Sequence, residues 1–252
     1  MNYITLKTLI TKEIKRFAKI YNQTIFAPLV NAMLFYIVLT VAFGSNAANS
    51  DSHKIYIATG LTIMSMLQNA FANAQGSVSM SKVLGFIVDW MLPPITKYEI
   101  IISIVIASVI RAIVVGAVVY FGLSFFLHNA LYSLWALVYF SIISCILFSM
   151  FGIIIGCLSD NFDTAHAYTS YLITPLTFLS GTFYSVHILP QFWQKLIMLN
   201  PVFYMIDGFR YSIMGSSESN IFVGSLVLLT LTFVTTVASI AVIGSKYKPV
   251  GM

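Results

Sequence analysis

Three charged side chains lie in segments that are otherwise apolar. Arg111 is the only charge deep in an apolar run, about 18 Å of helical rise beyond Glu99. At this depth a guanidinium cannot easily reach water, so we expect it to face protein or a water-filled cavity. A functional role and a structural pairing stay equally open. The other two charges, Asp207 and Arg210, are three residues apart in a short segment of moderate hydrophobicity.

A polar stripe follows the apolar segment 55–74. Its four members recur at spacings of three and four, which places them on one helix face: Thr62, Ser65, Asn69 and Asn73. Polar atoms avoid hydrocarbon, so this face should turn inward, toward neighbouring helices or a translocation path. The spacing does not separate these two roles. Asn69 and Arg111 are the candidate polar residues within the membrane.

Small side chains recur in a similar way along the segment 131–158: Ser141, Cys145, Ser149, Gly152 and Gly156. The last two form a GxxxG pattern, which lets two helix backbones approach closely. We interpret this row as a packing surface and not as a substrate site.

Several motifs of catalysis and ligand binding are absent from the sequence. No Gly is followed by Lys, so the chain lacks a phosphate-binding P-loop and should not hydrolyse ATP itself. The four histidines have no metal-ligand spacing. Asp160 and Asp163 are more typical of a solvated helix cap than of an acid pair. We therefore predict no enzymatic activity and no cofactor or metal on this chain. An intramembrane enzyme, which needs a nucleophile and an acid or base that converge, is one rival.

The composition shows which solvent surrounds the chain. Of its 252 residues, 59% are hydrophobic and 8% are charged, whereas a soluble domain has about 25% charged residues. So few charges cannot cover the surface of a soluble protein, and a disordered chain needs the opposite composition. We predict an all-α, polytopic membrane protein in which residues 1–252 form a single transmembrane domain.

Windows of about 20 apolar residues are long enough to cross a bilayer. Six spans are predicted, at about residues 25–43, 55–74, 100–127, 131–158, 167–184 and 221–243. The fifth contains Pro175, which neighbouring helices can accommodate. The length of chain before the first span favours a retained helix over a cleaved signal peptide.

The Lys and Arg residues predict the orientation of the spans. With six spans, both termini lie on one side. Nine basic residues fall on that side: Lys7, Lys12, Lys15, Arg16, Lys19, Lys82, Lys97, Lys246 and Lys248. Three fall on the other: Lys54, Lys195 and Arg210. The excess predicts a multi-pass membrane protein with both termini in the cytoplasm. It also explains the net charge of +5 without nucleic-acid binding.

The residues before the first span predict an interfacial helix at 1–22. Apolar residues recur at spacings of three and four from Tyr3 to Tyr21, and Lys and Arg occupy the opposite face. Such a helix lies on the membrane surface with its basic side toward anionic lipid head groups.

The loop at 76–99, between the second and third spans, contains a short apolar face. Its central residues are Phe86, Ile87 and Trp90, and two prolines at 93–94 end any helix there. This face is a candidate docking element for a soluble partner. An ordinary loop helix that rests on the bilayer is the alternative.

The segment at about 185–215 predicts a helical hairpin on the external side. Asn200 and Pro201 are typical of a helix start and Gly215 of a helix stop. The helix between them rises about 22 Å, which is short of the ~30 Å hydrocarbon core, and two charges interrupt it. Pro190 can open a second short helix upstream. We expect a re-entrant hairpin between spans five and six that does not cross the membrane.

The same stretch resembles the C-terminal signature of ABC-2 type transporter permeases, the membrane subunits of bacterial ATP-driven exporters. The residues that carry the resemblance are Leu179-Ser180-Gly181-Thr182-Phe183-Tyr184, Leu189-Pro190, Asn200-Pro201, Tyr204, Asp207, Arg210 and Gly215. In outline the resemblance covers the whole chain. Ser185 departs from it, because many members have Pro there, and this affects the entry into the hairpin. The resemblance implies that the membrane is a bacterial cytoplasmic (inner) membrane.

The resemblance implies a division of labour between proteins. Such permeases pair as dimers and bind two copies of a separate cytoplasmic ATPase, which holds the ATP and Mg. Docking would fall on residues 81–92 and 3–21, and the external hairpin would lie at the outer gate. The substrates would be lipid-linked glycans, lipids, drugs or other amphipathic compounds. An ion-coupled secondary transporter is the other rival; it needs ionisable residues near the bilayer midplane, where only Arg111 qualifies.

Overall fold

The computed structural model describes residues 3–42, 51–85, 95–125 and 131–246, and every regular element in these ranges is helical. The prediction of an all-α protein is confirmed. The long helices are α1 (Tyr3–Lys19), α2 (Ala27–Ala42), α4 (Asp51–Val83), α6 (Lys97–Ser124), α7 (Leu134–Leu158) and α12 (Ile221–Lys246). The shorter elements are η1 (Asn22–Phe26), α8 (Phe162–Tyr168), η2 (Thr169–Ile173), α9 (Thr174–Phe178), η3 (Val186–Ile188), α10 (Gln191–Met198) and α11 (Pro201–Met214).

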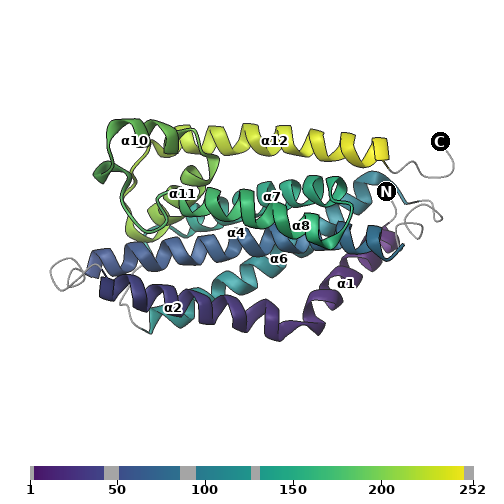
Figure 1. Cartoon of the computed structure of the whole chain (residues 1–252), viewed down its shortest axis with the longest axis horizontal. Helices are drawn as coiled ribbons and strands as arrows, with labels where there is room; N and C mark the ends of the chain where they lie inside the picture. The colour runs from purple at the N-terminus through teal and green to yellow at the C-terminus, as the bar shows by residue number, and fades with distance from the viewer. Residues whose placement is uncertain (1–2, 43–50, 86–94, 126–130, 247–252) are drawn as a thin grey trace.

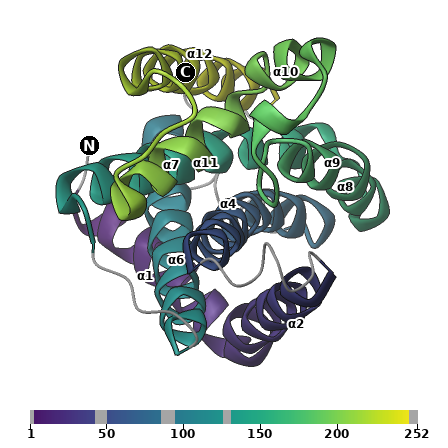
Figure 2. The same ribbon diagram turned by 90° about the vertical axis from the view of Figure 1, so that its left-hand side faces the viewer.

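The long helices form an elongated bundle around α4 (Figures 1 and 2). Five helical segments are long and apolar enough to cross a membrane: Asn22–Ala42, Ser52–Val83, Lys97–Ser124, Leu134–Leu158 and Ile221–Ser245. They lie at the positions of five of the six predicted spans. The start of α1 and the end of α12 are at the same end of the bundle, and α10 and α11 are at the other (Figure 1).

The fifth predicted span, residues 167–184, is not one regular helix. The chain passes from α8 through the π turn η2 to α9, and irregular backbone follows from Leu179. Pro175 explains the interruption, because it has no N–H for the carbonyl four residues earlier and a wider turn precedes it. Pro28 follows the π turn η1 in the same way, near the start of the first span.

The helix that contains the second predicted span, α4, is longer than the predicted apolar run at 55–74. α4 continues to Val83, so the start of the predicted loop at 76–99 is helical instead. Ser77, Ser79 and Ser81 are buried, and Lys82 donates a hydrogen bond of 2.8 Å to the carbonyl oxygen of Ser159 beyond α7. The serines suggested a solvated loop, but burial against neighbouring helices allows them to continue the helix.

Two glycines let α4 and α7 approach closely. A methyl group on Gly152 would lie 2.6 Å from the carbonyl oxygen of Phe71, and one on Gly156 would lie 2.8 Å from Cβ of Val78. Both neighbours belong to α4. The GxxxG pattern therefore serves helix packing, as its spacing indicates.

We predict that Gly152→Ala lowers the free energy of unfolding by about 1–3 kcal/mol, because the added methyl group overpacks the α4–α7 contact. Thermal unfolding in detergent can be followed with a thiol-reactive dye, since Cys145 and Cys157 are free and buried. Gly76→Ala is the matched control, because no described atom outside its own stretch of helix lies within 4 Å of the added carbon. The same loss in both variants would contradict a specific role for this close approach.

Candidate functional site

Four side chains at one end of the bundle, next to α10 and α11, form what we call the hairpin cluster: Tyr56, Asp207, Arg210 and Glu218. The Arg210 residue is 3% exposed, and Cζ of its guanidinium lies 3.4 Å from the centre of the Tyr56 ring. Nη2 of Arg210 also donates a hydrogen bond of 3.0 Å to the carbonyl oxygen of Gly181. An aromatic face and a backbone carbonyl thus stabilise the buried charge.

Glu218 connects Tyr56, and with it Arg210, to Val186, where the chain enters the hairpin formed by α10 and α11. One carboxylate oxygen lies 2.9 Å from the Tyr56 hydroxyl, and the other accepts a 2.9 Å hydrogen bond from the N–H of Val186. Burial lowers the pKa of Arg210, whereas Tyr56, Glu218 and Asp207 raise it. One cation and two carboxylates therefore share a small volume.

Asp207, three residues before Arg210, accepts hydrogen bonds from the chain that follows α11. Its side chain is buried and accepts hydrogen bonds from the N–H groups of Glu218 at 2.8 Å and Ser219 at 2.9 Å. The Ser219 hydroxyl donates a third bond of 2.5 Å. The carboxylate thereby holds the connection between α11 and α12 against α11.

The remaining signature residues shape the backbone around this cluster. Asn200 begins α11: its Oδ1 accepts a 3.1 Å hydrogen bond from the N–H of Val202, and its Nδ2 donates one of 2.9 Å to the carbonyl oxygen of Leu176. Pro201 occupies the first turn of α11, and Gly215, with φ of 71°, ends the helix. Asn200 thus also ties α11 to α9.

The upstream half of the hairpin is held in a similar way. Gly181 has φ of 70°, which orients its carbonyl toward Arg210, and Pro190 directly precedes α10. The Tyr204 hydroxyl donates a 2.9 Å hydrogen bond to the carbonyl oxygen of Met198 at the end of α10. The signature residues therefore fix how α10 packs against α11.

A second group of polar side chains lies nearer the other end of the bundle. We call it the arginine cluster, and it contains Glu13, Arg16, Asn69, Asn73 and Arg111. Arg111 donates a 3.0 Å hydrogen bond from Nη2 to Oδ1 of Asn69 and a 3.4 Å bond from Nη1 to Oδ1 of Asn73. Arg16 of α1 donates to the same Asn73 oxygen at 3.1 Å and lies 2.9 Å from a carboxylate oxygen of Glu13. The two candidate polar residues, Arg111 and Asn69, thus contact each other.

The two guanidinium groups are close enough to repel one another. Two like charges about 6 Å apart repel by roughly 3 kcal/mol at an effective dielectric constant of about 20. Burial lowers the pKa of Arg16, and the nearby Glu13 opposes that shift. Asn73 stabilises the pair as a shared neutral acceptor, and its Nδ2 donates a 2.9 Å hydrogen bond to Ser108 of α6.

The contacts of Arg111 relate it to the first candidate span. Arg16 lies near the end of α1, just before that span begins at Asn22. Arg16 and Arg111 both donate to Oδ1 of Asn73. Arg111 thus shares a hydrogen-bond acceptor with a residue that directly precedes the first candidate span.

A polar pocket of about 330 Å³ lies between α2, α4 and α9. Its polar lining comes from Asn31, Ser65, Gln68, Asn69 and Thr174. Two members of the predicted stripe, Ser65 and Asn69, therefore face this cavity. Thr62 lines a second pocket, and Asn73 is buried between helices, 1% exposed. The stripe thus serves both helix packing and the lining of a cavity.

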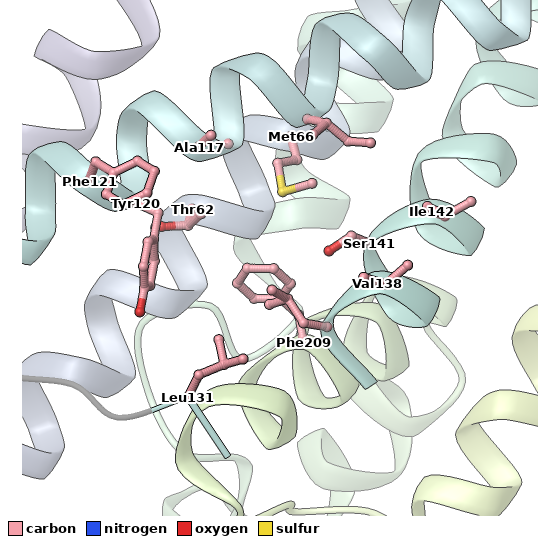
Figure 3. A pocket seen from close by; sticks show the side chains of 13 residues that line it. Thr62, Met66, Ala117, Tyr120, Phe121, Leu131, Val138, Ser141, Ile142 and Phe209 are labelled. Carbon is pink, nitrogen blue, oxygen red and sulfur yellow. The ribbon is translucent and has the colours of Figure 1, made fainter. Parts of the chain in front are cut away.

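A second pocket, of about 360 Å³, lies on the other side of α4, between α4, α6, α7 and α11. Figure 3 shows Met66, Leu131 and Phe209 around it. Its lining is almost entirely apolar, so it suits hydrocarbon and not a polar solute. Of the two cavities, the polar one is the better candidate for a transport path.

The comparisons with known proteins agree with this architecture. Residues 5–214 match the ABC-2 type transporter family. The chain is 34% identical over 219 residues to the inner membrane transport permease YadH of Escherichia coli K12, covering 86% of this chain and 85% of that protein. This chain belongs to the ABC-2 type transporter family. It is also 30% identical over 74 residues to nodulation protein J of Rhizobium leguminosarum bv. viciae, covering 29% of each.

Because it belongs to this family, the chain is the membrane subunit of an ABC transporter. It is a multi-pass protein of the inner membrane. The predicted docking residues Phe86, Ile87 and Trp90 lie outside the described residues of the permease. Within the described ranges, no group of three or more His, Cys, Asp or Glu side chains could hold a metal ion.

Four residues of the permease's two clusters were not singled out by the sequence analysis: Glu13, Arg16, Tyr56 and Glu218. Tyr56 and Glu218 lie near helix ends, where polar residues are ordinary, and Arg16 was counted only as part of a basic face. Two of the contacts join residues far apart in the chain: Arg16 reaches Asn73, and Tyr56 reaches Glu218. No local spacing could have connected these two pairs, whereas Glu13 and Arg16 are only three residues apart.

We predict that Asp207→Asn destabilises the permease by about 2–4 kcal/mol. The two carboxylate oxygens accept hydrogen bonds from three donors, whereas the amide keeps one acceptor oxygen and turns an NH2 group toward the other donors. The unfolding temperature in detergent measures the loss. Asp163→Asn, which removes an exposed carboxylate at the start of α8, is the matched control and should change little. If both variants unfold at the same temperature, the account of Asp207 is wrong.

Proposed function

We propose that this permease forms half of the path of an ATP-driven exporter for an amphipathic substrate. The observation that carries the proposal is the polar pocket between α2, α4 and α9, which gives polar groups a place beside membrane-spanning helices. Substrates of this kind include lipid-linked glycans, lipids and drugs. The pocket suits them because its amide and hydroxyl groups lie next to apolar walls formed by Phe35, Leu61 and Phe178.

A sixth crossing, by the segment 162–184, belongs to this proposal. Gln75 of α4 donates a hydrogen bond of 2.5 Å to the carbonyl oxygen of Ala165. The Tyr56 hydroxyl donates one of 3.0 Å to the carbonyl oxygen of Tyr184. The two α4 residues are about 28 Å apart along the helix, close to the ~30 Å hydrocarbon core. The segment thus follows α4 over about one membrane thickness, despite its π turn.

With six crossings, the termini lie on one side, which we assign to the cytoplasm. The shared end of α1 and α12 in Figure 1 supports this assignment, as does the excess of Lys and Arg on that side. α10 and α11 then form an external, re-entrant hairpin, because α11 has 14 residues and rises only about 21 Å.

A second copy of the chain completes the path in this proposal. Of the described α2 residues, Ala32 and Tyr36 are the ones that are buried. Residues of α2 form one wall of the polar pocket. A partner copy packed against α2 would cover its exposed apolar side chains and enclose the pocket. Two copies of a cytoplasmic ATPase would supply the energy and hold the ATP and Mg.

The Lys82 end of α4 leads toward the predicted docking residues. Lys82 lies 2.9 Å from a carboxylate oxygen of Asp160 and also contacts the carbonyl oxygens of Cys157 and Ser159. This contact joins the ends of α4 and α7. A force applied by the ATPase at residues 86–90 would therefore reach two spans together.

An ion-coupled secondary transporter is less consistent with the charges in the spans. The five candidate spans contain one carboxylate, Glu99, in the first turn of α6. Arg111 shares the acceptor Asn73 with Arg16, which lies just before the start of the first candidate span. A coupling-ion site needs ionisable groups near the midplane.

We predict that Trp90→Ala and Phe86→Ala each reduce the amount of ATPase that co-purifies with the permease, on the order of tenfold, because each removes an aromatic anchor from the docking face. Quantitative immunoblotting of the purified complex measures the change. Trp135→Ala, at an exposed aromatic residue of α7 on the opposite side, is the control. Unchanged recovery in the first two variants would refute the docking assignment.

The topology predicts opposite labelling of two exposed positions. In intact cells, a membrane-impermeant maleimide should label Ser217→Cys, beyond α11, and should not label Lys12→Cys on α1 until the cells are opened. Background labelling should be low, because Cys145 and Cys157 are buried. The reverse pattern would place the termini outside the cell.

A further inference from the structure

The arginine cluster contains more positive charge than the described residues around it neutralise. Glu13 lies 2.9 Å from Arg16. The hydrogen bonds of Arg111 in the described part of the chain end on the neutral amide oxygens of Asn69 and Asn73. Two guanidinium groups and one carboxylate leave a net charge of +1 at a partly buried position.

We propose that Arg16 and Arg111 bind the phosphate of an anionic lipid head group in the cytoplasmic leaflet. Guanidinium groups suit this ligand because several N–H donors in one plane match the oxygens of a phosphate. Both groups donate to Oδ1 of Asn73 over distances of 3.1 and 3.4 Å, so they are close enough for the remaining N–H donors of both to contact one phosphate. The anion balances the excess charge and reduces the repulsion between the two cations.

The location of the cluster favours a lipid as the source of the phosphate. Arg16 lies at the end of α1, next to the start of the first span, where head groups are located in the proposed topology. Its side chain is 27% exposed, so a head group can reach it from the surface. Lys12, Lys15 and Lys19 are exposed on the same helix and attract anionic lipid to this region.

The proposed lipid would link three elements. Arg16 belongs to α1, Arg111 to α6, and Asn73 to α4. A bound phosphate would therefore hold the interfacial helix against two spans. This inference goes beyond the transport function and uses only its topology, so it can fail while the exporter proposal holds.

The test uses the purified full-length permease and its unfolding temperature, followed through the buried cysteines. The probes are dihexanoyl phosphatidylglycerol, dihexanoyl phosphatidylcholine and inorganic phosphate. Phosphatidylglycerol should raise the unfolding temperature of the natural protein by several degrees, and the zwitterionic lipid should have a much smaller effect. Arg111→Gln and Arg16→Gln should each lose most of this shift. Lys12→Gln, which removes an exposed charge from the same helix, should keep it.

A second variant covers the case in which Arg111→Gln does not fold. Asn69→Asp keeps the oxygen that Arg111 contacts and supplies an internal carboxylate. It should fold at least as well without lipid as the natural protein does, and it should lose the response to phosphatidylglycerol. A full response in Asn69→Asp, or equal losses in Lys12→Gln and Arg16→Gln, would overturn the proposal. A full shift with inorganic phosphate alone would overturn the lipid as the source of the anion.

Discussion

Charged and polar groups between membrane-spanning helices cannot be hydrated, so each needs a partner in the protein or in a polar cavity. In this permease, several of the polar side chains that need such partners belong to α4. Tyr56 near one end contacts Glu218, Asn69 and Asn73 contact Arg111, and Gln75 contacts the backbone of Ala165. The other helices are arranged so that these groups find their partners.

This arrangement makes α4 a physical link between the two clusters. In the described part of the chain it contributes Tyr56 to the hairpin cluster and both asparagines to the arginine cluster. At Gly152, α7 approaches α4 so closely that an added methyl group would lie 2.6 Å from the carbonyl oxygen of Phe71. Arg16 of α1 therefore contacts the same helix that contacts Glu218 and the segment before α10.

Much of the architecture could be predicted because it depends on local properties. Apolar runs indicated the long helices, and Asn200, Pro201 and Gly215 indicated the bounds of α11 through cap chemistry alone. The continuation of α4 to Val83 could not be predicted in this way. Its serines are polar, and only burial against other helices makes a helix favourable there. The π turn before Pro175 likewise depends on neighbours that hold the interrupted segment.

The sequence by itself determined that the chain is helical, lies in a membrane, resembles the ABC-2 permeases and has buried charges that need partners. These properties follow from hydrophobicity, charge and cap residues, which act over one or two helical turns. Only the tertiary structure decided which partners those charges have. Arg210 stacks on Tyr56 rather than pairing directly with Asp207, and Arg111 shares Asn73 with Arg16. Such contacts join residues far apart in the chain, and they depend on how the helices pack, which no local spacing records.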